Sequence, residues 1–178
     1  MARKKYIKDY RLIETVDERG HIRSDYEYIG ADYRYVLGAE AAGRERKLLL
    51  TLCGAGIAAF LAALLPDAAG SHTVYVMLPF LFTAVPLGIV LDTVLTAMAR
   101  TEPLLHQQAD MLENRYPPAA LWTAILPAAS LAGQLVRLLL GGTVRWGDGV
   151  LALCAAALTA VGAVLFSRRG RILCREDD

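Results

Sequence analysis

The chain has 178 residues, 55% of them hydrophobic, and a mean hydropathy of +0.36. This apolar fraction exceeds what the interior of one globular domain needs, so the composition indicates that lipid surrounds part of the chain. The net charge of +1 says little as a sum, because most charged residues lie toward the two ends of the sequence. The scattered cysteines exclude a disulfide framework, and we expect reduced thiols at Cys53, Cys154 and Cys174.

Residues 1–37 are expected to form a cytoplasmic, tyrosine-rich β module. Six of the eight tyrosines lie in residues 6–36, where apolar and polar residues alternate as in a strand. A turn signal at residues 17–20, with Gly20 in a left-handed position, predicts a hairpin. Matching parity on its two sides predicts the facing pairs Val16 with Ile22, Leu12 with Tyr26, and Tyr10 with Tyr28. Beyond Gly30 the parity shifts to Tyr33 and Tyr35, which predicts a third short strand.

A sheet this small is marginal on its own, so its tyrosine face is expected to pack against the helix bundle, the lipid surface or a partner. The candidate partner-binding residues are Tyr10, Tyr26, Tyr28, Tyr33 and Tyr35. Basic and aromatic residues together also occur in nucleic-acid binders. Acidic residues in the same segment dilute the positive charge, and basic residues beside anionic lipid are already explained by membrane topology. We therefore expect a cytoplasmic protein partner rather than nucleic acid.

Four long apolar stretches follow, each close to the roughly 20 residues that a helix needs to cross a bilayer. Residues 38–47 are expected to form a juxtamembrane helical extension of the first stretch. The transmembrane domain is expected over residues 48–168, with helices at about 48–65, 73–99, 118–140 and 148–167. The loop 100–117 is expected to hold an interfacial helix, capped by Thr101 and begun at Pro103, or else to extend the second helix. Residues 169–178 are expected to form a cytoplasmic tail.

The distribution of Lys and Arg predicts the orientation, since these residues are retained in short cytoplasmic loops. Of the 19 basic residues, 11 lie in residues 1–47, two in the loop 100–117 and four in the tail. Arg137 and Arg145 lie near the opposite side. We therefore expect a protein integral to the cell membrane with both termini in the cytoplasm. The expected fold class is an all-α membrane protein: a four-helix transmembrane bundle with a small N-terminal cytoplasmic β-hairpin or three-stranded module.

Asp92 is the acidic residue that lies well inside an apolar stretch, about two turns from Arg100. Intramembrane carboxylates are costly and often functional, so Asp92 is the candidate ion or proton site. The alternative is a structural role at a shallow depth. Gln134 and Arg137 lie one turn apart, and one interpretation is an outward-facing polar spot; the one that we favour is that Arg137 snorkels to the lipid headgroups.

Prolines and small residues predict where the helices bend and touch. Pro79 and Pro86 are expected to interrupt the second helix, and Pro127 the third. Small residues recur at helical spacing in the first and fourth helices, where they allow close backbone approach. These residues are Gly54, Ala58, Ala62, Ala152, Ala156 and Ala160. We expect them to pack the bundle, with the face of a homo-oligomer as the alternative.

The sequence contains no Walker motif, nucleophile elbow, HExxH or dinucleotide fingerprint. His21, His72 and His106 form no ligand cluster, so no metal, cofactor or enzymatic activity is expected. Two functions remain. The patterned N-terminal module favours a non-catalytic accessory or interaction protein that docks a cytoplasmic partner at the membrane. The alternative is a small oligomeric transporter or channel that uses Asp92 for proton or cation handling.

Overall fold

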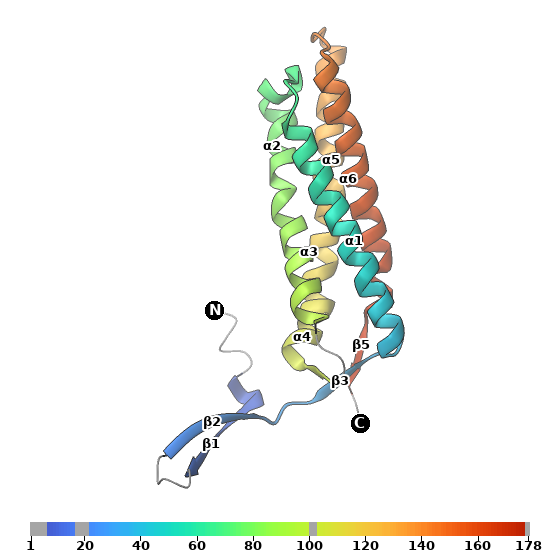
Figure 1. The fold of residues 1–178 in the computed structure, drawn as a ribbon. Coiled ribbons are helices and arrows are strands. Elements are labelled where there is room, and N and C mark those ends of the chain that lie inside the picture. The colour runs from blue at the N-terminus through green and yellow to red at the C-terminus, as the bar shows by residue number, and fades with distance from the viewer. Residues whose placement is uncertain (1–6, 17–21, 100–102, 177–178) are drawn as a thin grey trace.

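A computed structural model describes the chain except for residues 1–6, 17–21, 100–102 and 177–178. Its main feature is a bundle of long helices with small strand pairings at one end (Figure 1). The helices are α1 (Ala39–Leu64), α2 (Val74–Phe82), α3 (Ala84–Ala97), α4 (His106–Asp110), α5 (Tyr116–Leu139) and α6 (Trp146–Ser167). The strands are β1 (Tyr10–Val16), β2 (Ile22–Tyr28), β3 (Asp32–Tyr35), β4 (Leu104–Leu105) and β5 (Cys174–Glu176).

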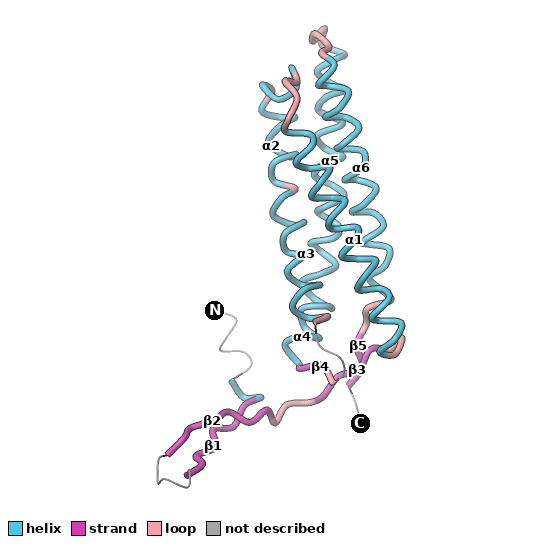
Figure 2. Tube along the Cα trace, in the orientation of Figure 1, coloured by secondary structure: helices cyan, strands magenta, loops and turns pink. Residues whose placement is uncertain are grey.

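Four helical segments are long and apolar enough to cross a membrane: Ala39–Leu64, Val74–Ala97, His106–Leu139 and Trp146–Arg171. Helix α5 packs against α6 on one side and against α2 and α3 on the other, while α1 packs against α3 and α6. The bundle therefore closes around an apolar core. We call the end that carries β3, β4 and β5 the sheet end, and the end with the two short interhelical connections the loop end (Figure 2).

The second apolar segment is broken at Thr83, between α2 and α3, close to Pro86, whereas Pro79 lies inside a continuous α2 and does not interrupt it as expected. Pro86 has no N–H to donate to the carbonyl of Phe82, four residues earlier. The Thr83 hydroxyl donates to the carbonyl of Pro79 at 3.1 Å, which ties the two halves together across the break. Pro127, in contrast, lies inside a continuous α5, so the expected interruption of the third helix is not observed.

The loop 100–117 differs from both of its predicted forms. Leu104 and Leu105 form strand β4, and a helical run then starts at His106 and continues into α5 instead of extending the second helix. Residues Met111–Arg115 form a π-helical turn, in which the N–H of Tyr116 donates to the Met111 carbonyl five residues earlier. The two prolines that follow Tyr116 lack N–H groups, which disfavours regular α-helical bonding here. Thr101, the expected cap, lies outside the described residues.

Strand β3 confirms the third predicted strand but does not join the hairpin. It pairs in antiparallel fashion with β4, placing Tyr33 opposite Leu104, and with β5, placing Tyr35 opposite Cys174. The sheet therefore joins three segments that are remote in sequence: the N-terminal segment, the segment before α4, and the C-terminal tail. The N-terminal module and the tail, separated in the sequence-based division, are connected at the sheet end.

The repeats of small residues do not pack the bundle as expected. Gly54 and Ala58 are exposed on α1, as are Ala156 and Ala160 on α6. Close contact occurs instead at Gly162, where an added Cβ would lie 2.4 Å from the backbone N of Ala124 in α5. The prediction chose the wrong faces, because spacing alone does not tell which side of a helix meets a neighbour. A homo-oligomer face on these exposed stripes stays a prediction.

Candidate functional site: a hairpin held at the sheet end

Strands β1 and β2 form the predicted antiparallel hairpin. The register pairs Val16 with Ile22, Leu12 with Tyr26, and Tyr10 with Tyr28, which confirms all three predicted pairs. The turn assigned to Gly20 lies outside the described residues. Figure 1 shows the hairpin extending beyond the sheet end and to one side of the helices.

Tyr28 and Asp9 attach the base of the hairpin to the start of α4. The Tyr28 hydroxyl donates to the carbonyl of Ala31 at 2.9 Å and accepts the N–H of His106 at 3.0 Å. Burial raises the pKa of the Tyr28 phenol, which therefore stays protonated as a donor. The Asp9 carboxylate lies 3.1 Å from Nδ1 of His106. Two contacts, one from the helical turn just before β1 and one from the end of β2, thus converge on one residue of the bundle.

Tyr33 and Tyr35 continue this attachment toward the bundle. The Tyr33 ring stacks on the His106 ring, with 5.7 Å between centroids. Tyr35 is buried in the core cluster at the sheet end, where Leu104 and Ile172 also lie. Tyr28, Tyr33 and Tyr35 therefore face inward, although the sequence offered them as partner-binding candidates. Tyr28 and Tyr33 are half-buried, and a protein partner would reach the buried Tyr35 only if the sheet end rearranged.

Leu12 and Tyr26 form an exposed apolar pair on the hairpin. They are 51% and 70% exposed, and they lie opposite each other in the register. Tyr10 borders this pair and contacts the Tyr28 ring edge-on at a centroid distance of 5.4 Å. Among the described residues, the helix bundle covers Tyr28, Tyr33 and Tyr35 but leaves this patch exposed, so the expected covering by the bundle applies to only part of the tyrosine face. Leu12 was not named as a site residue, although its shared parity with Tyr26 could have identified it.

Glu45 holds the C-terminal end of α6 against α1. Its carboxylate accepts hydrogen bonds from Arg168 at 3.0 Å and from Arg171 at 3.1 Å, and its side chain is largely buried. This contact places β5 beside β3. The sequence pattern did not point to Glu45, because its partners lie more than 120 residues later in the chain.

Asp92 lies on the exposed surface of α3, outside the apolar core. The hydroxyl of Thr96 donates to the Asp92 backbone carbonyl at 2.7 Å and lies 3.3 Å from the carboxylate oxygen Oδ1. The side chain is therefore partly satisfied by its own helix. Its role in ion or proton handling stays a prediction, and within one chain the bundle interior does not surround it.

Arg137 is buried rather than snorkelling, which corrects the sequence-based prediction. It is 8% exposed, and its Nη2 lies 3.0 Å from Oδ2 of Asp148 at the start of α6. Its Nη1 donates to the carbonyl of Thr143 at 2.7 Å. Asp148 also accepts the N–H groups of Gly70 at 2.7 Å and Arg145 at 2.8 Å, so a single carboxylate joins both connections of the loop end.

Gln134 is buried one turn before Arg137 and is likewise absent from the outer surface. The expected outward polar spot is therefore an inward one. The reason is Asp148, which lies across the connection between α5 and α6. A buried arginine is tolerated when a carboxylate and backbone carbonyls compensate its charge. A basic residue ending one helix and an acidic residue beginning the next is a signal that could have identified this pair.

A comparison of the chain with protein-family profiles, with curated protein sequences and with solved structures finds no match.

Proposed function

We propose that this protein is a membrane-anchored interaction protein whose hairpin docks a cytoplasmic protein partner through Leu12, Tyr26 and the edge of Tyr10. The observation that carries the proposal is an apolar cross-strand pair held outside the bundle by a specific attachment. Exposed aromatic and aliphatic side chains that are preorganised on a rigid element are typical anchors of protein interfaces.

In this proposal the four long helices span the membrane, and the sheet end faces the cytoplasm. The support is the basic character of the sheet end, where strand β3 of the N-terminal segment pairs with β5 of the C-terminal tail and where Arg168 and Arg171 follow α6. Retention of Lys and Arg on the cytoplasmic side orients such bundles. The hairpin is then presented to soluble cytoplasmic proteins rather than to the lipid that surrounds the helices.

Ion transport through Asp92 is the competing proposal, and it finds less support. A carboxylate that moves ions across a bilayer needs an aqueous path, whereas Asp92 lies on the outer surface of α3. Such a path would have to form between copies of the chain.

The test is affinity capture with the tagged full chain in mild detergent. We expect Leu12→Thr with Tyr26→Thr to reduce recovery of a cytoplasmic partner about tenfold or more, since interface anchors dominate binding energy. Threonine preserves the strand preference of both positions. The matched control is Arg11→Thr with Glu27→Thr, an exposed pair that occupies the adjacent register position and the opposite face.

The control variant should recover the partner within about twofold of the unmodified chain, because rim and off-face residues contribute little to affinity. Amide exchange should show protected β1 and β2 in both variants. Equal recovery with both variants, or equal loss with both, would contradict the proposed docking face.

A further inference from the structure

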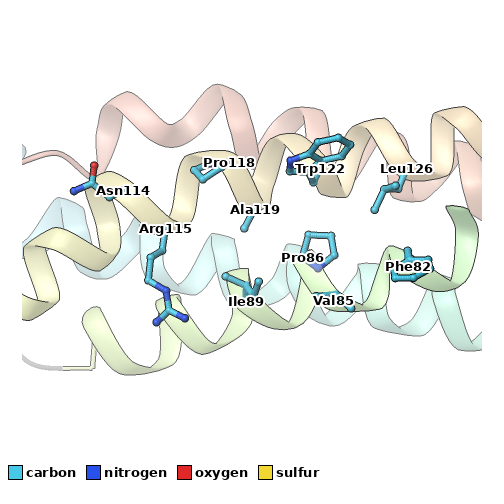
Figure 3. Close-up of a pocket in the computed structure, with 10 residues that line it drawn as sticks. All are labelled: Phe82, Val85, Pro86, Ile89, Asn114, Arg115, Pro118, Ala119, Trp122 and Leu126. Atoms are coloured by element: carbon cyan, nitrogen blue, oxygen red, sulfur yellow. The ribbon is translucent and has the colours of Figure 1, made fainter. Parts of the chain in front are cut away.

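An apolar groove of about 460 Å³ runs along the outside of the bundle between α3 and the first half of α5 (Figure 3). One wall is formed by Val85 and Ile89 of α3, and the other by Trp122 and Leu126 of α5. Its volume lies in the range of small-molecule sites. The groove opens on the surface that the proposed membrane orientation turns toward lipid, so an acyl chain fits its chemistry.

Polar groups occur at the sheet end of this groove. Arg115 and Asn114 line it there, and Figure 3 shows the Arg115 side chain extending toward α3. No ion pair between described residues involves Arg115, whose side chain is exposed. A guanidinium at the mouth of an apolar groove is suited to a phosphate oxygen, which it binds through paired N–H donors.

Asp92 lies on the same side of α3 as the groove. It follows Val85 by seven residues, which is close to two full turns, and follows Ile89 by three. Its carboxylate is therefore placed beyond the apolar wall, toward the sheet end, as Arg115 is on the opposite wall. The π-helical turn that carries Arg115 contacts α3. The groove mouth thus presents one positive and one negative group that are not paired with each other.

We propose that this groove binds a phospholipid whose headgroup carries a primary ammonium, of the phosphatidylethanolamine type. One acyl chain lies in the groove, the phosphate contacts Arg115, and the ammonium group contacts Asp92. A headgroup with phosphate but no ammonium leaves Asp92 beside a like charge. A choline headgroup carries the positive charge but has no N–H to donate to the carboxylate. The inference rests on the proposed insertion of the bundle in a bilayer.

Trp122 supplies the experiment, because it lines the groove, whereas Trp146 lies at the loop end. In the Trp146→Phe chain, reconstituted in vesicles, Trp122 fluorescence is titrated with lipids that carry bromine on the acyl chain. Brominated phosphatidylethanolamine should reach half-maximal quenching at a mole fraction about two- to fivefold lower than brominated phosphatidylcholine or phosphatidylglycerol, the size of one exposed ion pair. The Trp122→Phe chain, which reports on Trp146, should show no such preference.

Two variants assign the headgroup contacts. Asp92→Asn should remove the preference for phosphatidylethanolamine over phosphatidylcholine, and Arg115→Gln should weaken quenching by all three lipids. The control Arg44→Gln, which changes an exposed arginine of α1, should leave all three titrations unchanged. Equal quenching of Trp122 by lipids with every headgroup would overturn the inference. Absence of Trp122 quenching while Trp146 is quenched would also overturn it, because a second copy of the chain would then cover the groove. If neither tryptophan is quenched by any lipid, it is the membrane insertion that fails.

Discussion

Asp148→Asn is expected to lower the free energy of unfolding by about 3 kcal/mol or more, the cost of leaving one member of a buried ion pair without its partner. Asparagine keeps the shape of the side chain but has a single acceptor oxygen, so only one of the N–H groups of Gly70 and Arg145 keeps its acceptor. The charge of Arg137, which is largely buried at the loop end, is then no longer compensated. Unfolding by sodium dodecyl sulfate in mixed micelles measures the effect.

A second variant and a control separate charge from packing. Arg137→Met in the Asp148→Asn background should restore the part of the stability that was lost through the uncompensated charge, but not the part lost with the N–H acceptor. Asp67→Asn breaks the exposed pair with Arg145 at the same end of the bundle and should cost less than about 1 kcal/mol. Similar losses in the free energy of unfolding for Asp148→Asn and Asp67→Asn would show that the buried ion pair contributes no more to stability than the exposed one.

Gly162→Ala is expected to destabilise the bundle by about 2 kcal/mol, through overpacking between α5 and α6. The added Cβ would lie 2.4 Å from the backbone N of Ala124 and 2.6 Å from the carbonyl carbon of Thr123. Both atoms belong to the backbone of α5 and cannot move like a flexible side chain. The two helices would have to separate, and the same micellar unfolding assay would report the loss.

Gly149→Ala is the matched control in the same helix. An added Cβ at Gly149 meets no atom within 4 Å, so alanine should leave stability unchanged or raise it by up to about 1 kcal/mol through its higher helix propensity. The two substitutions should therefore have opposite signs. A stabilising Gly162→Ala would contradict the close approach of α5 and α6.

The features that the sequence predicted well are those with short-range causes. A strand has a side-chain period of two, so the parity of Leu12 and Tyr26 around one turn fixes the hairpin register. A helix that crosses a bilayer needs a certain length of apolar chain, so four such segments are visible without knowledge of their neighbours. Pro86 lacks an N–H, which explains the break at Thr83, although Pro79 and Pro127 lie inside continuous helices.

The features that sequence reasoning missed depend on contacts between remote segments. Strand β3 has too few residues to specify its partners, and it pairs with β4 and β5, which lie far along the chain. Tyr35 looks like a surface aromatic in the sequence, but this pairing buries it. Arg137 looks like a snorkelling residue until Asp148 is placed across the turn. Small residues such as Gly54 mark a helix face that would allow close packing, but they do not show whether another helix lies against that face.

Site-directed cysteine labelling tests most directly the central claim, that the bundle spans the cell membrane with the hairpin and both termini in the cytoplasm. Single cysteines replace Glu27, Gln107, Ser71 or Thr143 in a chain in which Cys53, Cys154 and Cys174 have been substituted. With a membrane-impermeant reagent and intact cells, Ser71→Cys and Thr143→Cys at the loop end should be labelled, and Glu27→Cys and Gln107→Cys should react only after lysis. Labelling of Gln107→Cys or Glu27→Cys in intact cells would contradict the claim.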